Sequence, residues 1–329
     1  MFSPILVRLN VCYRSKNASC YLACLFLSLT MAKSLLRSIA IVLSICWSAS
    51  LWVSLAIAPV LADPLSDPLA DPLWQLSIPT STAALSQPLS RFSDRDVKEI
   101  GQLREAAFAA TQSGDFTEAE RQWSALVERL PEEAAVWSNR GNVRVRQNDL
   151  EGALSDYTQA IALAPQEADP YLNRGAVWEA MGQWEKAIKD YNAVLQIDPD
   201  DPAAYNNRGN AEGGAGEWEL AIADYQAAIT LRPSFSLAYG NYALALYQTG
   251  SVDRSFQIMK SLVRKYPSFA DMRAALTAVL WAQGQAGEAE SNWVAVVGLD
   301  SRYKDINWVK NVRRWPPTMV RALENFLTL

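Results

Sequence analysis

The chain has 329 residues, of which half are hydrophobic and one fifth are charged, and its formal net charge is −5. This composition is typical of a folded globular protein and excludes disorder along the whole chain. The sequence has no histidine, and its four cysteines all precede residue 47. The rest of the chain therefore lacks disulfides, thiol chemistry, histidine acid–base catalysis and His/Cys metal sites.

Residues 1–62 have the composition of a targeting region, with five basic residues and no acidic one. Met1 and Met31 are both candidate starts, and a short basic stretch after Met31 leads into an uncharged apolar run over residues 39–62. The run ends in Val-Leu-Ala, which predicts an export signal cleaved after Ala62. The alternative is an uncleaved membrane anchor, because about twenty apolar residues can span a bilayer.

Cleavage after Ala62 would leave 25 Lys and Arg against 35 Asp and Glu, a formal net charge of −10. Such an acidic surface disfavours nucleic acid and anionic membranes as partners, because phosphate binding needs clustered cations. Residues 63–95 begin with a stretch rich in Pro and Ser that has no helical apolar period, which predicts a flexible linker. The alternative is a docking peptide built on its leucines and Trp74.

One 34-residue pattern occurs six times over residues 96–301, and its second, third and fourth copies read alike from Trp137, Tyr171 and Tyr205. A period of this length predicts a stacked solenoid in which each unit buries its apolar face against its neighbours. Within a unit, small residues recur in each of two expected helices, where they allow close antiparallel packing. They are Ala107, Gly141, Gly175, Gly209 and Ala243 in the first helix and Ala119, Ala153, Ala187, Ala221 and Ala289 in the second.

Residues that end helices recur at fixed positions of the repeat, and they also predict helical hairpins. The first helix of each unit is expected to end at a left-handed residue, for which Gly and Asn are best suited. These residues are Gly114, Asn148, Gly182, Gly216, Gly250 and Gly284. Proline is expected to stop the second helix of the first five units. These residues are Pro131, Pro165, Pro199, Pro233 and Pro267.

The pattern resembles the tetratricopeptide repeat family over residues 96–301. The sequence therefore predicts an all-α superhelical solenoid of about six helix-turn-helix units. Residues 302–329 are expected to form a C-terminal cap, in which apolar side chains cover the last unit. These side chains are Trp308, Trp315, Val320, Leu323 and Phe326.

More narrowly, the export signal, the array and the segment GLDSRYKDINWVKNVRRWPP together resemble tetratricopeptide proteins of cyanobacteria and of the chloroplast thylakoid lumen. This resemblance implies a photosynthetic source and a location in the thylakoid lumen or periplasm. The protein would be anchored in the membrane by residues 39–62 if the signal is not cleaved.

Asparagines recur in the first helices, which in arrays of this family line a concave groove. The predicted groove residues are Asn139, Asn142, Asn173, Asn207, Asn210 and Asn241. An amide both donates and accepts hydrogen bonds, so such a ladder can bind the backbone of an extended peptide. The alternative is that these amides stay solvated or bond a neighbouring turn.

At one fixed position of the first helix three units carry an arginine, and the same three units carry an aspartate at one fixed position of the second helix. The other three units have neither residue at these positions. The pairs are Arg140 with Asp156, Arg174 with Asp190 and Arg208 with Asp224. Their occurrence together predicts ion pairs within the array rather than a ligand-binding stripe.

Two features of the third and fourth units stand apart from the repeat. Gly213 and Gly214 lie inside an expected helix, which predicts either a soft point or a close helix contact. Trp184 and Trp218 begin second helices and are expected to pack, with an exposed aromatic anchor as the alternative.

The sequence therefore favours a non-catalytic scaffold or assembly factor that binds a protein or extended peptide in the concave groove, with no cofactor, metal or small-molecule substrate. One alternative is an architectural homo-oligomer formed through the C-terminal Trp-Pro-Pro segment. The other is an accessory domain of a lumenal enzyme.

Overall fold

The computed structural model describes residues 92–328, in which every regular element is a helix. Six helix-turn-helix units follow one another along the chain. Their first helices are α3 (Asp94–Ser113), α5 (Ala134–Arg146), α7 (Ala168–Ala180), α9 (Pro202–Ala215), α11 (Ser236–Gln248) and α13 (Ala270–Ala282). Their second helices are α4 (Phe116–Arg129), α6 (Leu150–Leu163), α8 (Trp184–Ile197), α10 (Trp218–Leu231), α12 (Val252–Lys265) and α14 (Ala286–Leu299). The described part of the chain is therefore an α-α solenoid, as predicted.

Three short elements follow the sixth unit: η3 (Ser301–Lys304), α15 (Ile306–Asn311) and α16 (Pro317–Leu327). The predicted targeting region, residues 1–62, and the predicted linker up to residue 91 lie outside the described residues. Among the described helices, none has the length and apolar character needed to cross a membrane.

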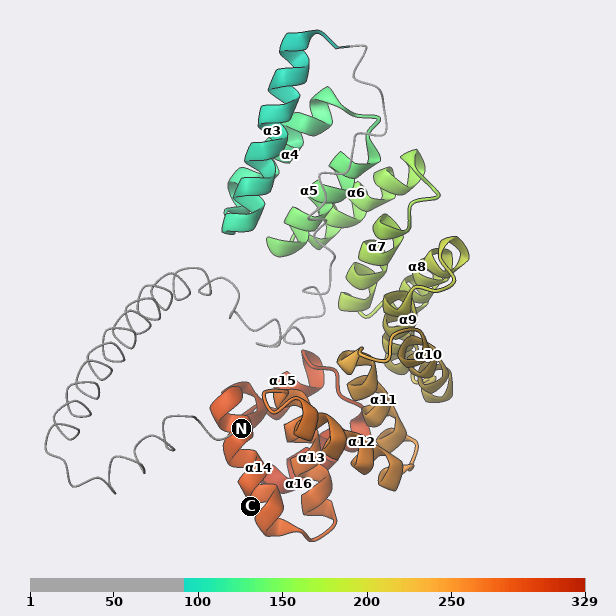
Figure 1. Ribbon diagram of the computed structural model, residues 1–329, viewed down its shortest axis with the longest axis vertical. Coiled ribbons are helices and arrows are strands. Elements are labelled where there is room, and N and C mark those ends of the chain that lie inside the picture. The colour runs from blue at the N-terminus through green and yellow to red at the C-terminus, as the bar shows by residue number, and fades with distance from the viewer. Residues whose placement is uncertain (1–91, 329) are drawn as a thin grey trace, which may run out of the picture. The chain divides into compact units, whose positions relative to one another are not determined.

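Each unit is an antiparallel pair that also contacts the next unit, as the row of helix pairs in Figure 1 shows. The first helices α5, α7, α9 and α11 also contact one another from unit to unit. The side of the array on which these helices lie is called the inner face below. The groove that the sequence predicts along the first helices lies on this face.

Glycine in the first helix lets a tyrosine of the second helix lie against the helix backbone. A Cβ atom added at Gly141 would lie 2.8 Å from the Tyr157 ring. The same pairing recurs between Gly175 and Tyr191 in the next unit. Both rings are fully buried. The prediction that small residues permit close helix packing is confirmed.

The predicted helix boundaries are confirmed in all six units. The predicted left-handed residue follows the first helix within two positions and has a positive φ in every unit, from 62° at Asn148 to 91° at Gly216. The second helices end two residues before the repeated proline, for example at Leu163 before Pro165. Proline lacks the N–H that would continue the helix, and its ring disfavours a helical residue before it.

The C-terminal elements cover the apolar end of the last unit, as predicted. Trp315, Leu323 and Phe326 are buried in one core with Val296, while Trp308 packs against it half-buried. The Phe326 ring makes edge contacts with the indole rings of α13 and α14, at centroid distances of 5.6 and 5.2 Å. Helix α16 contacts both α13 and α11, so the cap also touches the inner side of the fifth unit.

Candidate functional site

Asparagines of neighbouring first helices join one another across the inner face. Asn173 Nδ2 donates to Asn142 Oδ1 at 3.1 Å, which links α7 to α5. The same Asn142 oxygen accepts from the Tyr157 hydroxyl at 2.8 Å. Both asparagines are buried, yet Asn142 Nδ2 and Asn173 Oδ1 have no hydrogen-bond partner. The pair therefore retains one unused donor and one unused acceptor.

A second asparagine pair has the same spacing along the chain. Asn241 Nδ2 donates to Asn210 Oδ1 and to Asn206 Oδ1, each at 3.0 Å. The hydroxyl of Tyr225 donates to the Asn210 oxygen, as Tyr157 does to Asn142 in the first pair. These bonds link α11 to α9.

The remaining predicted asparagines lie beside these pairs. Asn207 is buried and accepts a hydrogen bond from Asn206, a neighbour that the sequence analysis did not single out. Asn139 donates to the Ala135 carbonyl of its own helix. The structure thus brings five of the six predicted asparagines into two clusters joined between units, whereas Asn139 bonds within its own helix. Contacting first helices place an amide within reach of the next unit, which the repeat pattern alone did not show.

The predicted arginine–aspartate pairs are present, and they hold successive units together. Arg174 donates to both carboxylate oxygens of Asp190, at 2.8 and 2.7 Å, within one unit. Its third nitrogen, Nη1, donates to Thr158 of the preceding unit. The hydrogen bonds to Asp190 raise the pKa of Arg174. The guanidinium is therefore engaged within the array and does not form a free basic stripe.

Two tryptophans form an aromatic wall on the inner side of the third and fourth units. A Cβ atom at Gly214 would lie 2.7 Å from the Trp184 ring, and one at Gly213 would lie 2.9 Å from the Trp218 ring. The alternative of a close contact at these glycines is thus confirmed, and helix α9 runs unbroken through them. Both indoles are half-buried, and they also line a cavity.

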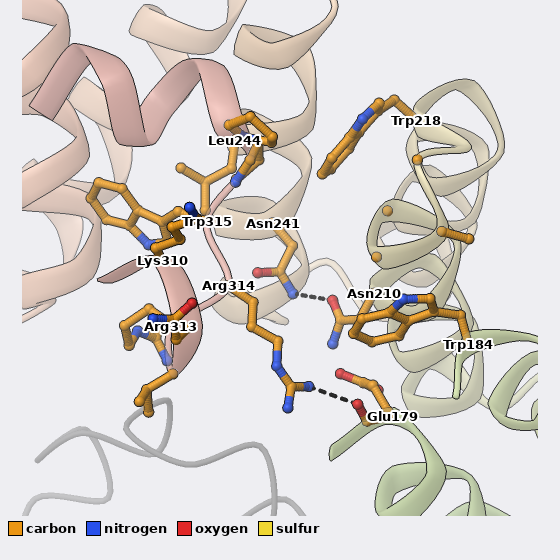
Figure 2. A pocket seen from close by; sticks show the side chains of 18 of the residues that line it. Glu179, Trp184, Asn210, Trp218, Asn241, Leu244, Lys310, Arg313, Arg314 and Trp315 are labelled. Atoms are coloured by element: carbon orange, nitrogen blue, oxygen red, sulfur yellow. Dashed lines mark hydrogen bonds between the residues drawn. The ribbon is translucent and has the colours of Figure 1, made fainter. Parts of the chain in front are cut away.

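The cavity has a volume of about 560 Å³ and lies between the first helices and the C-terminal segment. Figure 2 shows the Trp184 and Trp218 side chains on one side and Trp315 on the other. The amides of Asn210 and Asn241 also line it, so the second asparagine pair faces this space.

Two buried acids lie near the cavity. Burial raises the pKa of Glu179 to about 7, although the Arg314 charge and the Tyr191 hydrogen bond both lower it. That bond runs from the Tyr191 hydroxyl to Glu179 Oε2 at 3.0 Å. Burial, followed by the negative charge of Asp224, raises the pKa of Glu212 to about 7.

The segment between α15 and α16 returns to the inner face of the third unit. The Arg314 guanidinium donates to the carbonyl oxygens of Glu179 at 2.9 Å and Ala180 at 2.8 Å, as Figure 2 shows in part. It also lies over the Trp184 ring, with Cζ 5.5 Å from the ring centroid. Sequence reasoning missed this contact because it joins residues more than 130 positions apart.

The same segment is also anchored to α13, through contacts that do not involve Arg314. Asp271 is buried and its Oδ1 accepts from the Tyr303 hydroxyl, Trp315 Nε1 and the Arg313 guanidinium, at 2.6 to 3.1 Å. The cap is thus fixed to the sixth unit independently of the contact that Arg314 makes. Within residues 92–328, no group of three or more metal-ligating side chains is found.

Comparison with known proteins supports the tetratricopeptide interpretation. The family model described as TPR repeat matches residues 141–182 and 180–212, and the one described as Tetratricopeptide repeat matches residues 206–270. These residues span most of four units, from α5 to the start of α13. This part of the chain therefore matches tetratricopeptide repeat family models.

Tetratricopeptide repeat protein 36 of Bos taurus is 32% identical over 72 residues, which are 22% of this chain. The chain covers 38% of the length of that protein. A solved tetratricopeptide repeat protein from Parabacteroides merdae is 19% identical with a TM-score of 0.54, covering 70% of this chain and all of that one.

The Cut9–Hcn1 hetero-tetramer of the APC/C is a further solved structure that the chain resembles. Its TM-score is 0.53 at 16% identity, over 66% of this chain and 46% of that one. At such identities the likeness shows the fold alone. The narrower resemblance to thylakoid-lumen proteins stays a prediction.

Proposed function

We propose that the array is a non-catalytic scaffold or assembly factor that binds an extended segment of a partner protein on its inner face. The observation that carries the proposal is the unused donor of Asn142 and the unused acceptor of Asn173. Both atoms are buried, so binding requires the two amides to turn toward the inner face, where the carbonyl and N–H of one peptide unit can pair both. Because unpaired buried polar atoms cost free energy, binding that pairs them is favoured.

The second asparagine pair supports the same function. Asn210 and Asn241 repeat the geometry of the first pair and lie at the wall of the 560 Å³ cavity. Indole rings beside them supply flat apolar contacts for partner side chains. An extended segment that runs along the first helices would meet both pairs in turn.

Selection of peptides tests this function. A random-peptide display library is screened against the full chain, and dissociation constants of the selected peptides are measured by fluorescence polarisation. The double substitution Asn142→Ala and Asn173→Ala is expected to weaken binding at least about tenfold, because both backbone contacts are lost. Thermal denaturation checks that the double variant still folds.

Asn325→Ala is the matched control, because Asn325 is an exposed asparagine on α16, away from the asparagine clusters. Its affinity for the selected peptides is expected to equal that of the unchanged protein. Failure to select any peptide, or equal affinity of the folded double variant, would contradict peptide binding by these amides.

Most of the Trp-Pro-Pro segment expected to form a homo-oligomer is engaged within the chain, and Pro317 is exposed. Trp315 and Pro316 are buried within the chain, and the indole N–H of Trp315 already donates to Asp271. The Trp-Pro-Pro segment thus packs against its own array.

We further propose that the protein is exported to a thylakoid lumen or periplasm. The apolar run and the Val-Leu-Ala site before Asp63 support this location. N-terminal sequencing of the protein from its native source is expected to find Asp63 as the first residue. A native protein that still begins at Met1 or Met31 would instead support the membrane anchor.

A further inference from the structure

An arginine side chain fills one end of the cavity on the inner face, and the surroundings match its chemistry. The carbonyls of Glu179 and Ala180 lie in the last turn of α7, where the helix dipole is negative. The guanidinium of Arg314 donates to both carbonyls and lies over an indole face. A planar fork of donors suits this arrangement, whereas the ammonium of lysine does not.

A buried acid completes the arginine environment. The Glu179 side chain is only 7% exposed and lines the same cavity. Its carboxyl is held by the Tyr191 hydroxyl on α8. Carbonyls, indole and carboxyl therefore come from α7 and α8 alone, so the site is formed by the repeat array and not by the cap.

The occupant of this site is held in an unfavourable conformation. Arg314 has φ 52°, in the left-handed region that a non-glycine residue adopts at a cost of about 1–2 kcal/mol. The cap does not need this contact for its attachment, because Asp271 fixes the flanking residues to α13. The cavity extends beyond the guanidinium to Asn210 and Asn241. Arg314 is therefore strained, is not needed to attach the cap, and lies beside open space. Another arginine can replace it in this site.

We propose that the end of α7, with Glu179 and Trp184, is an arginine-binding site of the peptide groove. In the free protein Arg314 occupies it, and an arginine in an extended segment of a partner protein replaces Arg314 there. This inference depends on the proposed function, which it deepens by naming the partner's chemistry. The C-terminal segment then acts as an internal competitor for the groove.

The test uses a labelled peptide with the sequence of residues 311–318, acetylated and amidated, and the full chain. Arg314→Ala removes the competitor, so the dissociation constant of the peptide is expected to fall at least about tenfold relative to the unchanged protein. Adding Trp184→Ala to that variant is expected to reverse the gain. A peptide with lysine in place of its second arginine is expected to bind Arg314→Ala at least about tenfold more weakly.

Arg321→Ala is the matched control, because Arg321 is an exposed arginine of α16 whose guanidinium donates to Thr318 of the same helix. It is expected to bind the peptide as the unchanged protein does. If Arg314→Ala does not fold, Arg314→Lys is used, which keeps the charge but loses the planar fork. It is expected to shift affinity in the same direction.

Equal affinity of the peptide for the unchanged and Arg314-substituted proteins, or no binding to either, would overturn the inference. The two proposals fail separately. If display-selected peptides still depend on Asn142 and Asn173 while the arginine peptide does not bind, the arginine site is wrong and the proposed function stands. If neither set of peptides depends on its residues, both are wrong.

Discussion

At the scale of single residues, buried charge pairs join the repeat units. Arg174, Asp190 and Thr158 connect two helices of one unit with the preceding unit. Arg140 and Arg208 bond an aspartate in the same way, and they donate to Ser124 and Asn192 of the preceding unit. Such a pair adds little net stability over apolar residues, but removing one partner leaves the other charge buried and unpaired. These arginines therefore fix how the units stack.

Substitution of Arg174 by Met is expected to lower the free energy of unfolding by about 3–5 kcal/mol, because Asp190 keeps a buried charge. Adding Asp190→Leu is expected to recover most of this loss. Chemical denaturation of the full chain followed by circular dichroism measures both. Arg121→Met is the control, since its partner Glu118 forms an exposed pair. A change below about 1 kcal/mol is expected there.

At the scale of elements, the glycines of α9 determine where two tryptophans lie. Gly213 and Gly214 would each be poor choices inside an isolated helix. Here they remove the side chains that would collide with Trp218 and Trp184. The unfavourable local propensity thus permits the aromatic wall of the cavity. Faster hydrogen exchange in α9 than in α7 stays a prediction.

Gly214→Ala is expected to destabilise the protein by about 1–3 kcal/mol, because its methyl group would force Trp184 to move. Gly101→Ala in α3 is the control, because no atom lies within 4 Å of the added methyl group. That substitution is expected to stabilise by about 0.5–1 kcal/mol. Thermal denaturation compares the two, and equal shifts of one sign would contradict a steric role for Gly214.

The end of α7 is expected to make stability depend on pH. The pKa of Glu179 is about 7 in the folded protein and near its ordinary value of 4.5 when unfolded. Folding therefore favours the protonated acid. The contribution of Glu179 to the stability of the folded protein is full below pH 4.5 and is lost as pH rises through 7. Glu179→Gln is expected to reduce the fall in stability between pH 5 and pH 8, by about 3 kcal/mol at most.

Thermal denaturation at several pH values measures this effect. Glu212 titrates in the same range, so part of the pH dependence is expected to remain in Glu179→Gln. Glu118→Gln is the control, because hydrogen bonds from Arg121 and Gln122 lower the pKa of Glu118 to about 2. The contribution of Glu118 to stability changes only below pH 4.5. If the stability of Glu179→Gln fell with pH as steeply as that of the unchanged protein, the prediction would be contradicted.

At the scale of the whole described array, the C-terminal segment returns to contact the third unit. Residues 310–317 of the C-terminal segment border a cavity whose other wall comes from the third, fourth and fifth units. Asp271 anchors this segment through Tyr303, Arg313 and Trp315. One carboxylate oxygen thus holds the cap in place, and with it the position of Arg314.

Asp271→Ala is expected to destabilise the C-terminal units by about 3 kcal/mol, because it removes the acceptor of three buried or half-buried donors. Hydrogen exchange is expected to become faster in α13, α15 and α16 and to stay unchanged in α3 and α4. Local effects of this kind follow from contacts limited to neighbouring units. Asp253→Ala, at an exposed position of α12, is the control with no expected change.

The repeating elements can be predicted from the sequence, because each helix boundary depends on a local property. A left-handed residue or a proline acts within one turn, and small residues at fixed spacing define the helix contact. The same reasoning predicted the pairing of Arg174 with Asp190, since both lie in one unit. It also predicted that Trp315, Val320, Leu323 and Phe326 are buried in the cap, whereas Trp308 is half-buried.

The contacts on the inner face could not be predicted from the sequence, because they depend on how successive units pack. The asparagine clusters depend on how closely successive first helices approach, and Asn206 entered one of them without a signal in the repeat. The return of Arg314 to α7 depends on the summed rotation of several units between them. A 34-residue period contains no information about that sum, because small differences in each packing contact add along the array.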